Sequence, residues 1–226
     1  MAEKRKSNKK KRRLTRKRKV RLIQIIIAVI VVALIYTAAF LLIRKFDRKK
    51  NIDASKPEID VQLLTVNKYS RPGMEADKIN GVVVHYTANP GSTAKENRDY
   101  FESLKDGHDT SVSSHFVIGL DGEIIQCVPT WEYAYASNHR NHDTVSIECC
   151  HPDNSGEFTK DTYYSLVQLT GWLCLKFDLD ADDVIRHYDV TGKNCPKYFV
   201  ENEDKWIEFK EDVKRAMKKT NIGELE

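Results

Sequence analysis

Acidic residues are almost absent from the first 50 residues of the chain. This segment carries 18 lysines and arginines but two acids, Glu3 and Asp47, and 13 of the basic residues lie within residues 1–21. The basic tail also lacks aromatic side chains, on which proteins that bind single-stranded nucleic acid stack bases. The composition therefore favours a role in membrane topology over nucleic-acid binding, although a membrane-tethered nucleic-acid protein stays open as an alternative.

Charge is absent from residues 22–43, where Gln24 is the single strongly polar side chain. A helix of this length spans about 33 Å, enough to cross the hydrocarbon core of a bilayer. The apolar region of a cleaved signal peptide is shorter, about 7–15 residues. We therefore predict an uncleaved signal anchor. Because 13 basic residues precede it and five follow it, we expect a single-pass membrane protein with a cytoplasmic amino terminus and an extracytoplasmic domain.

Basic residues are scarcer than acidic ones in the rest of the chain. Residues 51–226 carry 19 basic and 31 acidic side chains, a net charge of −12. Charge of this sign disfavours binding to nucleic acid, and it would not by itself hold the domain on an anionic surface.

Internal repeats are also absent, and no low-complexity segment follows the basic tail. We predict a linker over residues 44–56, which are charged and lack periodicity. Residues 57–226 are long enough to bury one core, so we expect a single domain there, monomeric by itself.

Hydrophobic periodicity after the linker predicts alternating strands and helices. An apolar run at 82–86 is typical of a central strand, and Leu120-Asp121-Gly122 is a strong hairpin signal. Ser92 is the expected cap of the first helix in this domain. The predicted strands are 82–86, 115–118, 123–128, 144–149 and 184–188, and the predicted helices are 93–104, 161–177 and 202–218. The expected fold is α/β, with a central mixed β-sheet flanked by helices.

Two histidines and a cysteine stand out as candidate metal ligands. His187 and Cys195 lie close in sequence with Lys193 between them, and His85 closes an apolar run. Two histidines, one thiolate and a nearby cation are typical of an open catalytic zinc site, which leaves a fourth position free for water. His115 is a rival ligand, but a histidine beside Phe116 more often serves as a hydrogen-bonded scaffold.

Four motifs carry a resemblance to a known family. They are Val84-His85-Tyr86-Thr87-Ala88-Asn89-Pro90-Gly91, Ser114-His115-Phe116-Val117-Ile118, Ser146-Ile147-Glu148, and His187 followed by Lys193, Cys195 and Pro196. In that order, over about residues 60–200, the chain resembles the zinc N-acetylmuramoyl-L-alanine amidases of the type-2 amidase and peptidoglycan-recognition-protein superfamily. The resemblance implies peptidoglycan as substrate, zinc held by His85, His187 and Cys195, and an oxyanion stabilised by Lys193.

The general base differs between members of that family. Some carry a catalytic tyrosine before the His-Phe pair, where this chain has Ser114, a poor base. Others carry a glutamate on the strand that here reads Ser146-Ile147-Glu148. Because Val145 and Ile147 suit the core, strand alternation turns Glu148 toward the opposite face. We therefore predict Glu148 and Lys193 as the catalytic residues.

Three further points stay open from the sequence. A membrane-anchored receptor that binds peptidoglycan without cutting it is the main alternative, although the third ligand, Cys195, argues against it. The other cysteines can be paired or reduced, depending on the environment; they are Cys127, Cys149, Cys150 and Cys174. Three histidines in polar loops, His139, His142 and His151, are expected to be solvated or to line the substrate site.

Overall fold

The structure is a computed structural model that describes residues 2–218, and it describes the side chains of residues 16–46, 52 and 55–218. The predicted basic tail therefore lies partly outside the described residues, as do residues 219–226 of the predicted domain. Residues up to Asn51 form one compact unit and those from Ile52 onward form another.

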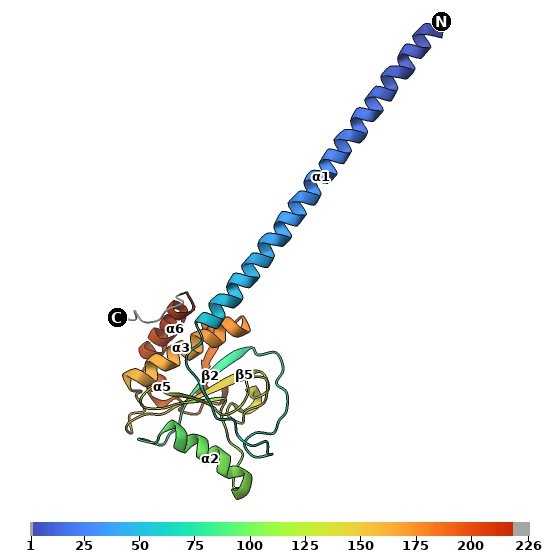
Figure 1. Cartoon of the computed structure of the whole chain (residues 1–226). Coiled ribbons are helices and arrows are strands. Elements are labelled where there is room, and N and C mark those ends of the chain that lie inside the picture. The colour runs from blue at the N-terminus through green and yellow to red at the C-terminus, as the bar shows by residue number, and fades with distance from the viewer. Residues whose placement is uncertain (1, 219–226) are drawn as a thin grey trace. The chain divides into compact units, whose positions relative to one another are not determined.

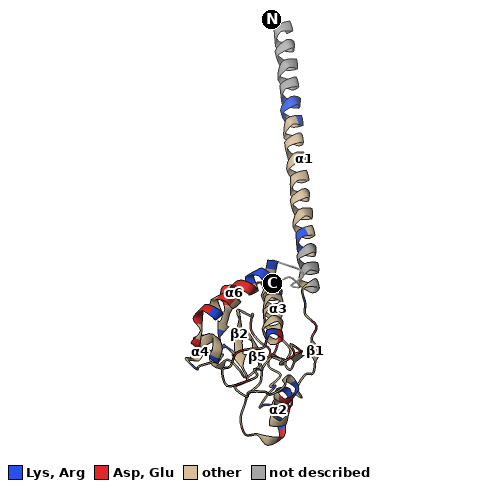
Figure 2. Cartoon of the chain, turned by 90° about the vertical axis from the view of Figure 1, so that its left-hand side faces the viewer, with Lys and Arg blue, Asp and Glu red and all other residues tan. Residues whose placement is uncertain are grey.

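The first unit is a single helix. Helix α1 (Ala2–Ala54) runs through the uncharged segment and continues through residues 44–54 of the predicted linker. Its stretch Arg16–Phe46 contains an 18-residue window with a mean hydropathy of 3.0 and is long and apolar enough to cross a membrane. Figure 2 shows basic residues at both ends of this stretch, on either side of the uncharged residues 22–43. Length and composition alone support this assignment, and a signal sequence has the same character.

The second unit is built on a mixed sheet. Its strands in the described residues are β1 (Asp60–Val61), β2 (Gly81–Tyr86), β3 (Phe116–Ile118), β4 (Ile124–Gln126), β5 (Thr144–Cys149) and β6 (Val184–Arg186). They lie in the order β1-β4-β3-β5-β2-β6. Strands β3 and β4 are antiparallel and the other neighbours are parallel. The predicted mixed sheet and the hairpin at Asp121-Gly122 are confirmed.

Helices cover both faces of this sheet. They are α2 (Ala94–Gly107), α3 (Lys160–Phe177), α4 (His187–Thr191), α5 (Lys197–Glu201) and α6 (Glu203–Lys218). Helices α3 and α6 lie on one face, and α2 lies on the other (Figure 1). In β3, Phe116 packs toward the α3 side and Val117 toward the α2 side, as strand alternation requires.

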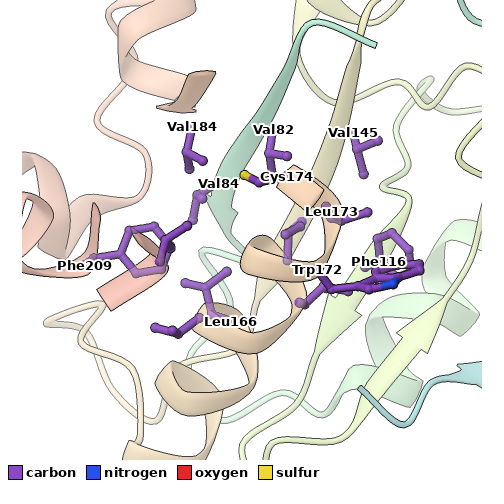
Figure 3. Close-up of a cluster of buried hydrophobic side chains, with 14 of the residues drawn as sticks. Val82, Val84, Phe116, Val145, Leu166, Trp172, Leu173, Cys174, Val184 and Phe209 are labelled. Atoms are coloured by element: carbon purple, nitrogen blue, oxygen red, sulfur yellow. The ribbon is translucent and has the colours of Figure 1, made fainter. Parts of the chain in front are cut away.

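The larger core lies between the sheet and helices α3 and α6. Figure 3 shows Val82 and Val84 facing Leu166 and Leu173, with Phe209 beside them. In β5, Val145, Ile147 and Cys149 join the same core. The intervening residues, including Glu148, therefore face the other side of the sheet, as predicted.

The cap of α2 was predicted one residue too early. Thr93, and not Ser92, is the cap: its hydroxyl oxygen accepts from the backbone N–H of Glu96 at 3.2 Å. The Glu96 carboxylate in turn accepts from the backbone N–H of Thr93 at 2.8 Å, which completes a capping box. Ser92 instead donates to the Asn89 carbonyl at 2.7 Å.

The prediction of a strand over 184–188 was wrong at its end. Strand β6 stops at Arg186, and His187 is the first residue of helix α4. An Asp189 carboxylate oxygen accepts from the backbone N–H of Arg186 at 2.8 Å, as the third residue of a helix does in a capping box, and this bond favours a helical start at His187. His187 therefore sits on a helical turn directly after a buried strand.

Candidate active site

His85 and Glu148 are brought together by the pairing of two central strands. They are direct register partners in the parallel pair β2–β5. Side chains of register partners leave the same face of a sheet. The Nδ1 atom of His85 consequently lies 4.0 Å from Oε1 of Glu148, on the face opposite the larger core.

His187 and Cys195 reach the same place through a short closed segment. The backbone N–H of Tyr188 donates to the Cys195 carbonyl at 2.8 Å, which ties the two ends of the segment together. Gly192 turns the chain with a φ of 77°, a left-handed conformation suited to glycine. The segment returns Cys195 to the strand end that carries His85.

These three residues form one compact group. The Sγ atom of Cys195 lies 3.9 Å from Nδ1 of His85, and the rings of His85 and His187 are 4.6 Å apart between centroids. One potential ligand atom from each residue lies within 4.8 Å of the others, and all three residues are buried. The three candidates from the sequence thus meet around a common space.

A buried arginine fixes the turn that carries His187. The guanidinium of Arg186 contacts Asp189 at 3.0 Å, Glu203 at 2.5 Å and the Phe199 carbonyl at 3.1 Å. These bonds connect α4 to α5 and α6. Because the Arg186 side chain is 10% exposed and each partner accepts a hydrogen bond, the network holds the start of α4 in one position.

The surroundings of both histidines favour the neutral imidazole. Burial lowers the pKa of His85 well below its usual value, and the charges of His187 and Lys193 lower it further. Burial also lowers the pKa of His187, with Lys193 acting in the same direction. A neutral imidazole keeps one lone pair, which a metal ligand needs.

Cys195 lies in surroundings that disfavour a free thiolate. Burial raises the pKa of its thiol to about 12, with a further contribution from Glu148, whereas Lys193 opposes the shift. A cation at the cluster would offset this cost. Bond lengths of about 2.1 Å to nitrogen and 2.3 Å to sulfur put tetrahedral zinc ligands roughly 3.6 Å apart. The 3.9 Å between Cys195 Sγ and His85 Nδ1 fits such an ion.

Glu148 places a partly exposed carboxyl group beside the cluster. Burial raises its pKa to about 8, and Lys193 opposes this shift. Its side chain is 16% exposed, and its Oε2 atom has no hydrogen-bond partner among the described residues. A carboxyl of this kind can exchange a proton with a small molecule that enters the site.

Lys193 supplies a positive charge to this group of residues. Its side chain is exposed, yet its charge acts on His85, His187, Glu148 and Cys195. The site therefore combines a neutral donor set, an acid–base carboxyl and a cation that can stabilise negative charge.

His115 and Ser114 lie outside the three-residue cluster. His115 is fully buried: its Nδ1 accepts from the Ser146 N–H at 3.0 Å, and its Nε2 donates to the Glu132 carbonyl at 2.9 Å. Ser114 is also buried and donates to the Ser146 carbonyl at 3.0 Å. Both residues brace β5 from the loop before β3, as a scaffold does.

The three loop histidines, expected to be solvated or to line the substrate site, differ in their exposure. His139 is exposed. His151 is 1% exposed and is therefore not solvated, so for this residue the other expectation, that it lines the substrate site, stays a prediction. Its Nδ1 donates to the Asp153 carbonyl at 2.7 Å, and its ring packs 5.1 Å from that of Tyr86. His142 lies 3.6 Å from Asp143 and is half-buried.

Sequence reasoning missed two residues that contact the cluster. The Nε2 atom of His85 lies 3.2 Å from Ser137 Oγ, and Nε2 of His187 lies 3.1 Å from Asn138 Oδ1. Both residues belong to the polar run 137–142, whose composition is equally typical of a solvated loop. Polarity alone gave no signal that would have separated them from their neighbours.

All five cysteines are free and buried in the structure. The sequence left open whether Cys127, Cys149, Cys150 and Cys174 form disulfides, and the structure has them unpaired. Cys127 and Cys150 lie in the smaller core on the α2 side, and Cys149 and Cys174 lie in the larger one. They act as small apolar side chains there.

Comparison with known proteins places these residues in a family context. Residues 75–198 match the family described as N-acetylmuramoyl-L-alanine amidase. The chain is 33% identical over 181 residues to the N-acetylmuramoyl-L-alanine amidase BlyA of Bacillus subtilis strain 168, covering 71% of this chain and 48% of that protein. It is 30% identical to the amidase CwlL of Bacillus licheniformis, covering 66% of this chain and 44% of that protein. The chain thus spans about half the length of the curated relatives it matches.

Solved structures show the same fold. A mutant endolysin from Bacillus subtilis superimposes with a TM-score of 0.60 at 26% identity, covering 70% of this chain and 99% of that one. The catalytic domain of XlyA superimposes with a TM-score of 0.60 at 24% identity, with the same coverage. At 24% identity, the similarity to the catalytic domain of XlyA shows a shared fold alone.

Proposed function

The chain belongs to the N-acetylmuramoyl-L-alanine amidase family, and from this premise we propose that it hydrolyses the amide bond between the muramic acid lactyl group and L-alanine in peptidoglycan. The observation that carries the proposal is the cluster of His85, His187 and Cys195 with Glu148 beside it. A receptor that only binds the polymer has no need for this donor set beside a carboxyl that can exchange protons.

In this proposal zinc is the cofactor, held by His85, His187 and Cys195. The donor set of two neutral imidazoles and one thiol suits zinc, and the separation of its atoms fits a tetrahedral ion. Zinc, when bound, supplies Lewis acidity and lowers the pKa of a coordinated water to about 7.

The protein's own residues handle the proton and the developing charge. Glu148 accepts the proton of the attacking water at its free carboxylate oxygen and returns it to the nitrogen of the departing L-alanine. The Lys193 ammonium stabilises the negative oxygen that forms when water adds to the amide carbonyl. The raised pKa of Glu148 suits both halves of this proton cycle, since a group that takes up a proton must also release it.

We further propose that α1 anchors the protein in the cell membrane, with the basic tail in the cytoplasm and the domain outside, where peptidoglycan is found. The uncharged residues 22–43, which lie inside the candidate span Arg16–Phe46, and the excess of basic residues before them support this arrangement. The acidic domain would then be held near the wall by its tether, because charge does not attract it there.

The activity is tested with the full chain in detergent and purified peptidoglycan. We expect stoichiometric zinc in the protein and the release of peptides that carry a new amino-terminal L-alanine, without new reducing sugar ends. Cys195→Ser serves as the inactive comparison. Binding to peptidoglycan with no product from the wild-type chain would favour the receptor alternative and overturn the proposal.

A further inference from the structure

Two consecutive residues of the loop before β5 contact the two histidines of the cluster, one each. Ser137 Oγ lies 3.2 Å from Nε2 of His85, and Asn138 Oδ1 lies 3.1 Å from Nε2 of His187. These loop residues are 52 and 49 positions away from their histidines in sequence. In each histidine, the contact is made to the Nε2 atom of the ring.

The chemistry of Asn138 selects one tautomer of His187, and the Ser137 hydroxyl is compatible with the same tautomer of His85. The amide oxygen of Asn138 only accepts hydrogen bonds, so Nε2 of His187 carries the proton. The Ser137 hydroxyl accepts in the same way when Nε2 of His85 is protonated. In a neutral imidazole the lone pair then resides on Nδ1. For His85 this is the atom that faces Cys195 Sγ at 3.9 Å.

We propose that Ser137 and Asn138 are positioning residues for the metal site: they hold His85 and His187 in the tautomer and ring orientation that present Nδ1 to the ion. This inference rests on the proposed function, because it assumes that the two histidines bind zinc. Hydrogen bonds from such outer residues orient metal-bound histidines and raise their basicity.

The backbone at Asn138 is suited to presenting two neighbouring side chains to one site. Asn138 has a φ of 54°, in the left-handed region that asparagine tolerates better than most residues. The turn at this position lets Ser137, which is buried, and Asn138 address two different rings of the cluster.

Hydrogen bonds made by Asn141 and Arg140 also hold the loop in place. The side-chain oxygen of Asn141 accepts from the backbone N–H groups of Ala136 at 3.1 Å and Ser137 at 2.6 Å. Arg140 pairs with Asp143 at 2.8 Å, and its carbonyl accepts from the Thr144 hydroxyl at 2.7 Å. The positions of Ser137 and Asn138 are thus set by the loop itself, which gives a preorganised outer shell.

The positive φ at Asn138 makes a matched pair of variants possible at this position. Asn138→Gly removes the acceptor oxygen and keeps a residue that adopts positive φ freely, whereas Asn138→Asp restores an acceptor oxygen at the same place. Ser137→Ala removes the other acceptor. His139→Ala is the control, since His139 is exposed in the same loop.

Zinc affinity of the full chain in detergent, measured by competition with a chromophoric chelator, tests the proposal. We expect Asn138→Gly and Ser137→Ala to bind zinc about 10- to 100-fold more weakly than wild type. Asn138→Asp and His139→Ala should stay within a few-fold of wild type. The Co²⁺-substituted protein should show altered visible bands in Asn138→Gly and restored bands in Asn138→Asp. Without metal, the Asn138→Gly and Asn138→Asp variants should unfold at the same temperature.

Three outcomes decide between the possibilities. Wild-type zinc affinity in both Asn138→Gly and Ser137→Ala overturns the positioning role and leaves the proposed function intact. Equal weakening by Asn138→Gly and Asn138→Asp also overturns it, because the effect would then come from the loop and not from the acceptor. A wild-type chain that binds no zinc overturns the proposed function together with this inference.

Discussion

Glu148 lies directly beside His85 in the β2–β5 pair, with 4.0 Å between Oε1 of the carboxyl and Nδ1 of the imidazole. The contact follows from strand register, because a shift of one residue would turn either side chain into the core. The relationship places a proton-exchanging group next to a candidate metal ligand without making it part of the three-residue cluster. Substitutions of the carboxyl and of the ligands should therefore differ in their effect on zinc.

We expect Glu148→Gln to keep stoichiometric zinc while its turnover falls by about 10²–10⁴, the usual contribution of a positioned acid–base group. Glutamine keeps the shape of the side chain but accepts no proton. Zinc content and the rate on peptidoglycan are the measurements. Ser114→Ala is the companion variant: it removes the bond to the Ser146 carbonyl, so we expect a loss of about 1 kcal/mol in stability and a near-normal rate. The reverse pattern of rates would assign the base to Ser114.

Each of His85→Ala, His187→Ala and Cys195→Ser should lose both zinc and hydrolysis, because two remaining ligands bind the ion too weakly. Metal analysis of the purified variants and the peptidoglycan assay provide the readouts. Cys127→Ala is a matched control, since this cysteine lies in the smaller core. If any of the three variants kept one zinc per chain and normal turnover, the ligand set would be wrong and His115 would be the next candidate.

Lys193→Ala should retain zinc and lower kcat by about 10²-fold, with a smaller change in KM. The reason is that the ammonium interacts most strongly with the oxyanion, which exists only in the transition state. Steady-state kinetics on a soluble muropeptide measure both constants. Lys197→Ala is the comparison, because Lys197 is a nearby cation that donates to the Asn154 carbonyl at 2.6 Å. An equal loss in both variants would point to general charge and not to Lys193.

The stability of the domain should depend on His115 below neutral pH. Burial lowers the pKa of His115 from 6.5 to about 4 in the folded state. Between about pH 4 and pH 6.5, His115 therefore binds a proton in the unfolded chain but not in the folded chain. Neutral His115 makes its full contribution to the free energy of unfolding above about pH 6.5. As the pH falls toward 4, this free energy decreases by about 3 kcal/mol. Denaturant unfolding of the metal-free chain across this range measures it, and His115→Gln should show a flatter dependence. Parallel curves for the two proteins would contradict the assignment.

Protease added to intact protoplasts should remove the domain and leave the basic tail protected. The expectation follows from the 13 basic residues before the apolar stretch and the five after it. Antibodies against residues 2–15 and against the domain distinguish the two fragments. A domain that survives in intact protoplasts and is cut after their lysis would place it in the cytoplasm, away from the wall.

Local sequence determined the elements that carry the site. Strands β2 and β5 could be predicted because apolar residues alternate or run continuously there, and alternation alone turned Glu148 away from the core. The spacing of His187, Lys193 and Cys195 likewise indicated a metal site, since two donors and a cation close to one another in sequence need only a short loop to converge.

Tertiary structure decided what depends on distant contacts. Strand order, the burial of His151, and the approach of Ser137 and Asn138 to the histidines all involve residues far apart in sequence. Hydrophobic periodicity records which face of an element is buried, but it does not record which polar loop side chain meets which ring. The helical start at His187 was missed for a related reason, because the Asp189 cap replaced the strand that the apolar residues favoured. Side-chain hydrogen bonds of this kind are set by the folded geometry, and the sequence holds no periodic trace of them.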